Sequence, residues 1–131
     1  MDAADAAEEI WTDVSSQIGD DLRAVMRFTP TDHAAKMRPD VRETYTLEEK
    51  RNVADDTIVA QLGLSETERG IKAGELEAVV RVFGEAWVVS WADGQERKSG
   101  VNVSISRDGD ATMADVAWCL DYLSEFGARL D

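Results

Sequence analysis

The chain has 131 residues, 44% of them hydrophobic, which suits one domain with a small core. Asp and Glu number 27 against 14 Lys and Arg, and the resulting net charge of −13 disfavours nucleic acid as a partner. The sequence has no apolar run of about 18 residues to span a membrane and no signal-peptide pattern, and its single cysteine excludes an internal disulfide and a cysteine-cluster metal site.

The acidity has a particular composition. Asp (15) exceeds Glu (12), and Arg (10) exceeds Lys (4). Such a surface repels itself little in concentrated salt, where the Debye length falls to about 3 Å. The composition therefore predicts a halophilic, cytoplasmic protein, with an ordinary acidic protein as the alternative. Concentrated salt also weakens the argument against nucleic acid, because phosphate neutralisation counts for less there.

Residues 1–7 are acidic and alanine-rich, and we expect them to be loose. An amphipathic helix follows, closed by Gly19, with apolar residues at helical spacing: Ala7, Ile10, Trp11, Val14 and Ile18. Residues 22–28 alternate as a strand with one buried face, formed by Leu22, Ala24, Met26 and Phe28. After a turn at 29–32, residues 33–38 are a weakly specified strand that Pro39 ends, so an edge position is expected.

Thr46 and Glu49 form a capping box that opens a helix running to about Leu62, with Gly63 at its end. Residues 65–68 offer a second capping box for a short helix near Ile71.

Residues 76–91 predict a β-hairpin with a two-residue turn at Gly84-Glu85. This turn pairs Val82 with Trp87, Val80 with Val89 and Ala78 with Trp91, all on one side of the sheet. That side should be covered, which makes Trp87 and Trp91 core residues. The reverse side carries Val79, Arg81, Phe83 and Val88.

A polar loop is predicted at 93–100, followed by a half-buried strand whose inward residues are Val101, Val103 and Ile105. Asn102, Ser104 and Ser106 alternate with them. Thr112 and Asp115 cap a last helix, with Gly127 as its C-cap. Its predicted inner stripe is Met113, Val116, Ala117, Leu120, Leu123 and Ser124.

The order α-β-β-α-β-β-β-α predicts one α+β domain over residues 1–131, with a five-stranded antiparallel sheet and helices packed on one face. The topology is similar to roadblock, longin and profilin-like domains, and PAS and GAF sensors share the general plan. Topology alone says little about function.

Four segments carry a resemblance to a family: GDDLRAVMRF, Tyr45-Thr46 at a helix start, ELEAVVRVFGEAWVVSW, and GVNVSISRDGD before the last helix. Over roughly residues 19–126 the chain resembles a family of small uncharacterised haloarchaeal proteins. The resemblance implies a salt-adapted cytosol and assigns no activity.

No residue pattern predicts a catalytic, cofactor or metal site. His33, the only histidine, stands beside Asp32 in an expected turn or edge strand, and Cys119 flanks the last helix's stripe as a small apolar residue. Asp108-Gly109-Asp110 lacks the ligand order of a calcium loop and suits a turn. Arg23, Arg27 and Arg81 lie on predicted strands, where they can form an arginine patch on the open sheet face or pair with carboxylates.

Trp118 and Tyr122 point away from the predicted stripe of the last helix. They can pack on the first helix near Trp11, form an interface, or line a ligand site. The interface hypothesis therefore comprises Trp118, Tyr122, Val79, Arg81, Phe83 and Val88.

The sequence favours a non-enzymatic protein-interaction or regulatory module whose partner is a second copy of the chain or another protein. The alternative is a PAS- or GAF-like small-molecule sensor with a pocket between the sheet and the 46–62 helix. That alternative fails if Trp87 and Trp91 fill the pocket. Weaker possibilities are an enzyme, which would need His33 or a carboxylate pair in a cleft, and a DNA-associated regulator, for which no helix-turn-helix is recognisable.

Overall fold

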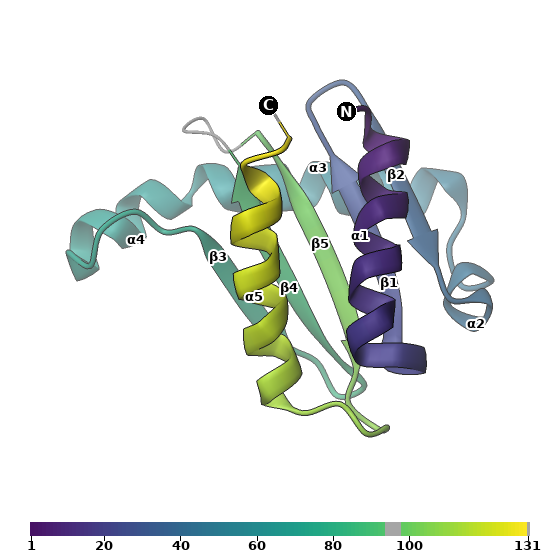
Figure 1. The fold of residues 1–131 in the computed structure, drawn as a ribbon. Helices are drawn as coiled ribbons and strands as arrows, with labels where there is room; N and C mark the ends of the chain where they lie inside the picture. The colour runs from purple at the N-terminus through teal and green to yellow at the C-terminus, as the bar shows by residue number, and fades with distance from the viewer. Residues whose placement is uncertain (94–97, 131) are drawn as a thin grey trace.

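The fold is organised around one antiparallel sheet with helices on both sides (Figure 1). The computed structural model describes residues 1–93 and 98–130. The strand order is β2-β1-β5-β4-β3. The strands are β1 (Leu22–Phe28), β2 (His33–Met37), β3 (Ala78–Val82), β4 (Ala86–Asp93) and β5 (Ser99–Ser106). The predicted α+β class and the five-stranded antiparallel sheet are confirmed.

Two long helices, α1 (Ala3–Ile18) and α5 (Met113–Gly127), lie side by side on one face of the sheet, and α3 (Leu47–Leu62) crosses behind it (Figure 1). Ala54 of α3 packs with Met26 and Phe28, whereas Val25 of the same strand belongs to the core beneath α1 and α5. The expectation that helices cover one face is therefore right for α1 and α5 and wrong for α3. A short 3₁₀ turn (Gly19–Asp21) and the helices α2 (Pro39–Arg42) and α4 (Leu64–Ile71) complete the order.

The main core fills the space between the sheet and the pair α1 and α5. Trp87 and Trp91 are each 9% exposed there, as predicted. They pack with the inward residues of β5, which are Val101, Val103 and Ile105, and with Ile10 and Val14 of α1. Every predicted hairpin pair is found, including Val82 with Trp87 and Ala78 with Trp91. The Gly84-Glu85 turn is closed by a hydrogen bond from the Phe83 N–H to the Ala86 carbonyl.

The N-terminal segment is helical rather than loose. Asp2 is the N-cap, and its side chain accepts a hydrogen bond from the Asp5 N–H at 2.8 Å. Ala3, Ala6 and Ala7 are buried against the rest of the molecule. Small side chains let the first turns of α1 pack closely, and this contact outweighs the acidity that suggested disorder. Gly19 ends the helix with φ of 72°, as predicted.

Strand β1 buries residues on both of its faces, which the prediction of a single buried face missed. Its register against β5 shifts between Leu22 and Ala24. Leu22 belongs to the core under α1 and α5, whereas Met26 and Phe28 face α3. The register shift at the start of β1 changes which face the side chains point to, so Leu22 lies on the opposite face from Met26 and Phe28.

Several predicted element boundaries shift. Residues 33–37 form edge strand β2, as predicted, paired with β1 from Ala24↔Met37 to Phe28↔His33. The predicted loop at 93–100 is shorter, because β4 extends to Asp93 and β5 begins at Ser99; residues 94–97 lie outside the described residues. Helix α4 begins at Leu64 straight after α3, and its N-cap is Gly63; the predicted second capping box involves the side chains of residues 65 and 66, which lie outside the described part of the structure.

The buried stripe of α5 consists of Val116, Cys119, Leu123 and Phe126. The predicted stripe is partly wrong, because Met113 is 55% exposed and Ala117 and Ser124 are also exposed. Phe126 is the largest side chain on this helix that is fully buried, and burying it turns Cys119 inward. Gly127 is the last helical residue rather than a cap, and it lies against the Trp91 ring. In the described residues no helix is long and apolar enough to cross a membrane.

Gly127→Ala should destabilise the protein, because a Cβ at this position would overlap the six-membered ring of Trp91. Overpacking of this kind costs about 1–3 kcal/mol. Chemical denaturation followed by tryptophan fluorescence measures the change in the free energy of unfolding. Gly70→Ala is the matched control, since a Cβ there meets open space. Equal stability of the two variants would contradict the close packing.

Candidate functional site

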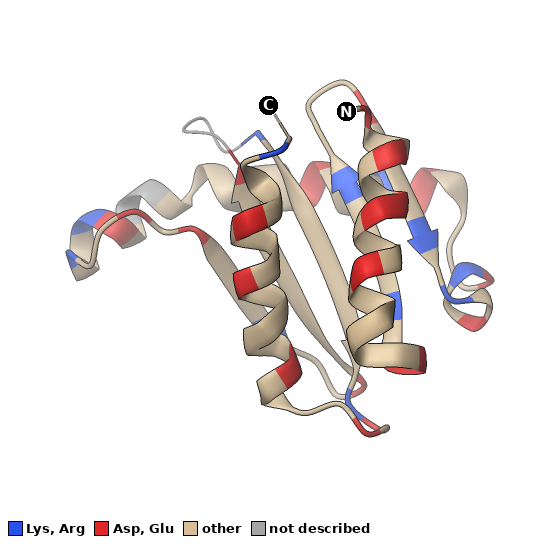
Figure 2. Ribbon diagram, in the orientation of Figure 1, with Lys and Arg blue, Asp and Glu red and all other residues tan. Residues whose placement is uncertain are grey.

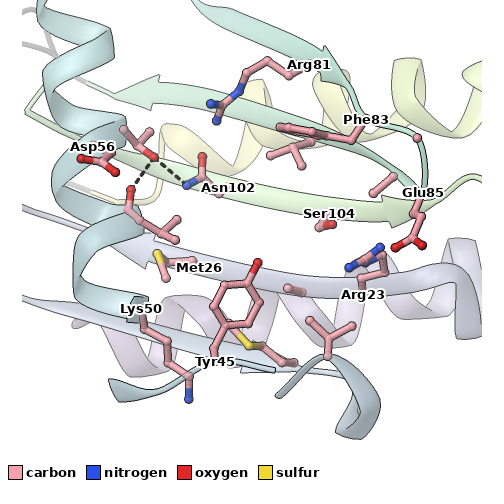
Figure 3. A pocket seen from close by; sticks show the side chains of 18 residues that line it. Arg23, Met26, Tyr45, Lys50, Asp56, Arg81, Phe83, Glu85, Asn102 and Ser104 are labelled. Carbon is pink, nitrogen blue, oxygen red and sulfur yellow. Dashed lines mark hydrogen bonds between the residues drawn. The ribbon is translucent and has the colours of Figure 1, made fainter. Parts of the chain in front are cut away.

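A cavity of about 540 Å³ lies between the sheet and α3 (Figure 3). Its floor is the sheet face opposite the main core, and one wall is the inner side of α3. The lining residues are Arg23, Ala24, Met26, Met37, Val41, Tyr45, Lys50, Val53, Asp56, Thr57, Arg81, Phe83, Gly84, Glu85, Ala86, Val88, Asn102 and Ser104. Trp87 and Trp91 are on the other side of the sheet and do not fill this space.

The composition of α3 leaves this space open. The residues that α3 buries are Ala54, Thr57 and Gln61, which are small or polar. Its large apolar residues Val59 and Leu62 are 69% and 51% exposed. The larger apolar side chains on its inner side, Val53 and Ile58, are only partly buried against Met26 and Phe28, so α3 does not fill the space above the sheet and a cavity remains.

A chain of hydrogen bonds crosses the cavity floor to α3. The Arg81 guanidinium donates to the Ser90 hydroxyl at 3.1 Å, and Ser90 donates to Asn102 Oδ1 at 2.7 Å. Asn102 Nδ2 donates to Thr57 Oγ1 at 3.1 Å, and Thr57 donates to the Val53 carbonyl at 2.7 Å. This network satisfies the buried Ser90, Asn102 and Thr57 and ties the sheet to the helix.

Arg23 reaches the cavity because of the irregular start of β1. Leu22 faces the main core, whereas both Arg23 and Ala24 line the cavity. A β-bulge re-aims side chains in this way, since two consecutive residues oppose one residue of the partner strand. The Nε atom of Arg23 is buried and has no hydrogen-bond partner within the described residues. A buried donor without an acceptor is costly, which makes this atom a candidate binding group.

The sequence predicted that the strand arginines either pair with carboxylates or form a patch on the open sheet face, and the structure shows both arrangements. Arg27 is only 6% exposed and pairs with Asp93 at 2.6 Å, so it has a structural role. Arg23 and Arg81 instead line the cavity together with Lys50. None of these three cations has an ion pair in the part of the chain that the structure describes.

The predicted interface residues on the hairpin lie on one face, as their pairing requires. Arg81, Phe83 and Val88 line the cavity, with Phe83 51% exposed, and Val79 is half-buried beside Ser90. The sequence did not identify Lys50, Thr57 and Asn102 as parts of the site. Asn102 and Ser104 alternate with apolar residues, a pattern that also fits a solvent-facing side, so nothing in it indicated a covered cavity.

Strand β3 forms an open edge of the sheet next to the cavity. At the two ends of its pairing with β4, the Phe83 N–H donates a hydrogen bond to the Ala86 carbonyl and the Ala92 N–H donates one to the Glu77 carbonyl. Alternation in an antiparallel pair then directs the backbone N–H and C=O groups of Ala78, Val80 and Val82 outward. Val82 is also 61% exposed.

Trp118 and Tyr122 lie on the side of α5 next to α1. Their rings stack with centroids 5.4 Å apart, and Tyr122 stacks in turn on Phe126. The Tyr122 hydroxyl donates to Asp13 Oδ2 on α1 at 2.6 Å. Burial, and secondarily this bond, raise the pKa of Tyr122. Both rings are partly buried against the main core, as is Trp11, so packing on α1 is the observed arrangement. Their proposed interface role stays a prediction.

The remaining candidate residues lie in separate places. His33 is in edge strand β2, opposite Phe28, and Cys119 is fully buried beneath α5. Burial raises the pKa of the Cys119 thiol to about 12. The turn at 108–110 is held by Asp21, whose carboxylate accepts from the N–H groups of Asp110 and Ala111. Among the described residues, no group of three or more His, Cys, Asp or Glu side chains is arranged to hold a metal ion.

Comparisons with known proteins place the chain by family and by fold. Residues 8–124 match the model of a domain of unknown function, DUF7522. The crystal structure of a Roadblock/LC7 domain from Streptomyces avermitilis is similar, with a TM-score of 0.53 and 13% sequence identity. The similarity covers 90% of this chain and 94% of that one, and it confirms the predicted roadblock-like fold. No curated protein matches the sequence.

Cys119 should resist thiol reagents in the folded protein. Its pKa of about 12 leaves little thiolate at pH 8, compared with a free cysteine of pKa about 8.5. We expect a reaction with dithionitrobenzoate at least about a hundredfold slower than that of the chain unfolded in guanidinium. The absorbance of the released thiolate measures it. Rapid labelling of the folded protein would contradict the burial of this side chain.

Proposed function

The chain belongs to the DUF7522 family of domains of unknown function, and we propose that it is a non-enzymatic protein-interaction module that forms a homodimer. The observation that carries the proposal is the apolar surface that α3 leaves exposed. This helix buries Thr57 and Gln61 and exposes Val59 and Leu62. Val59 and Leu62 are three positions apart and therefore neighbours on one helix face, and adjoining exposed apolar residues of this kind indicate a surface that another protein covers.

The open edge of β3 supports the same interface. Figure 1 shows α3 passing behind the sheet toward the β3 side and continuing into α4 there. Ile71 of α4 is 70% exposed, so this apolar side chain lies at the same end of the molecule as the β3 backbone groups that have no partner strand in the described residues. A strand edge of this kind is a template for adding another strand.

A second copy of the chain is the occupant that we propose. Two β3 strands can pair antiparallel about a two-fold axis near Val80, which makes the contact self-complementary. The outward backbone groups of Ala78, Val80 and Val82 would bond their counterparts. The exposed apolar residues of α3 and α4 from the two copies would then flank the joined sheets.

Charge sets the conditions for such a dimer. Each copy carries −13, and Asp and Glu follow the outer sides of α1 and α5 (Figure 2). At low ionic strength two such molecules repel, whereas at molar salt the Debye length is about 3 Å and the repulsion is short-ranged. We therefore propose a salt-rich cytoplasm as the working environment.

A small-molecule sensor is the second candidate function, and the cavity favours it. Its volume of about 540 Å³ is within the range of ligand-binding pockets, roughly 300–1,000 Å³. It occupies the predicted place, between the sheet and the 46–62 helix. Trp87 and Trp91, whose presence there would have excluded this function, pack on the opposite side of the sheet.

Light scattering after size exclusion in molar KCl tests the dimer. We expect twice the chain mass of 14.4 kDa for the unmodified protein. Val59→Asp places a charge in the proposed interface, and Val80→Pro removes an outward N–H; each should raise the dimer Kd at least about tenfold. Met113→Asp is the matched control, an exposed apolar residue on the opposite side of the molecule, and should leave the mass unchanged.

A monomeric unmodified chain would refute the homodimer. Trp118→Ala with Tyr122→Ala tests the other predicted interface on α5. If this double variant dissociates the dimer and Val59→Asp does not, the interface lies on α5 rather than at β3.

Thermal unfolding at increasing KCl tests the salt adaptation. Raising KCl from about 0.1 M to about 3 M should raise the Tm, because it screens repulsion among excess carboxylates. A variant with Glu48→Gln, Asp55→Asn and Asp121→Asn, all at exposed positions, should respond less to salt. A Tm that does not change with KCl would contradict the proposal.

A further inference from the structure

We propose that the cavity under α3 binds a small organic anion, with its charged group on Arg81 and its apolar body against the sheet. The proposal rests on the second function above, a small-molecule sensor, and names the class of ligand. It does not depend on the homodimer.

The side chains around the cavity carry a net positive charge, whereas the whole chain is strongly negative. Arg23, Lys50 and Arg81 line it with two carboxylates, Asp56 and Glu85, which gives a local formal charge of +1 in a chain of −13. Figure 3 shows these five side chains around the same space. None of the three cations is ion-paired within the described residues, although carboxylates outnumber cations about two to one along the chain.

The two arginines have donors to spare. Arg23 Nε is buried without an acceptor in the described part of the chain. Arg81 has five N–H donors, and the structure records one bond from them, to Ser90. A carboxylate, sulfonate or phosphate group accepts several such bonds at once, and charge-assisted bonds are the stronger kind. Because Ser90 and Asn102 hold the Arg81 guanidinium at the cavity floor, a site for an anion is already in place.

The rest of the lining suits an apolar body. Met26, Met37, Val53 and Phe83 surround the space that the charged groups leave. Methionine side chains adapt to irregular shapes, and Phe83 offers a ring for stacking. The combination favours a ligand with one anionic group and an aromatic or aliphatic part rather than a small inorganic ion.

A pair of dyes that differ in one charged group tests the proposal. Anilinonaphthalene sulfonate carries an anion, and N-phenyl-1-naphthylamine has the same rings without it. At a fixed salt concentration, fluorescence titration should give a lower Kd for the sulfonate. Arg81→Met should weaken sulfonate binding about tenfold and change binding of the neutral dye little, whereas Arg23→Met, on the other side of the cavity (Figure 3), should weaken sulfonate binding less. Arg42→Met, an exposed arginine outside the cavity lining, is the control and should change neither.

A variant that fills the cavity shows where the dyes bind. Val88→Trp places a large ring in the cavity and should abolish binding of both dyes, with circular dichroism to verify folding. Displacement of the sulfonate dye by benzoate or by phenyl phosphate would support the proposal and identify the preferred anionic group.

Two results would overturn the assignment in different ways. If the two dyes bind equally and Val88→Trp blocks both, the cavity takes small molecules but does not select anions. If Val88→Trp blocks neither dye, they bind elsewhere, and both the anion site and the sensor function fail. Neither result bears on the mass measurements that test the homodimer.

Discussion

The pleat of the three central strands is the constraint on which the rest of the structure depends. Trp87, Val89 and Trp91 of β4 and the three apolar residues of β5 point to one face, where α1 and α5 cover them. Because successive residues alternate, Ser90, Asn102 and Ser104 must point to the other face. That face therefore has less apolar surface, and only a small cluster of Met26, Phe28 and Ala54 packs there beneath α3. Because the second face carries fewer apolar side chains, α3 packs on it incompletely, and a polar network and a cavity lie between them.

The distribution of charge follows the same division. Carboxylates lie mainly on solvent-facing sides of helices and in turns, where water and salt can screen them (Figure 2). The strand arginines differ in their surroundings. Arg27 is neutralised by Asp93 and also donates to the Gly100 carbonyl, which links β1, β4 and β5 at one end of the sheet. Arg23 and Arg81 face the cavity without such a partner in the described residues, so similar residues on neighbouring strands have different roles.

Strand β3 contributes to two surfaces, the open edge of the sheet and the lining of the cavity. Its outward backbone groups belong to Ala78, Val80 and Val82, whose side chains face the α5 side of the sheet. Arg81 and Phe83 point to the cavity instead. The proposed homodimer and the proposed ligand site can therefore be separated by substitution at neighbouring residues, because alternate residues of a strand contribute to different surfaces.

The sequence by itself determined what depends on neighbours along the chain. The register of the β3–β4 hairpin follows from a two-residue turn, and the caps at Thr46 and Thr112 follow from residues three positions apart. Tertiary structure decided the rest. The stripe of α5 shifts because Phe126 must be buried, and residues 3–7 are ordered because their alanines fit closely. The position of α3 makes Asn102 part of a cavity, and the register shift at the start of β1 brings Arg23 into the same lining. A strand pattern tells which residues share a face, but what covers that face depends on contacts between residues far apart in the sequence.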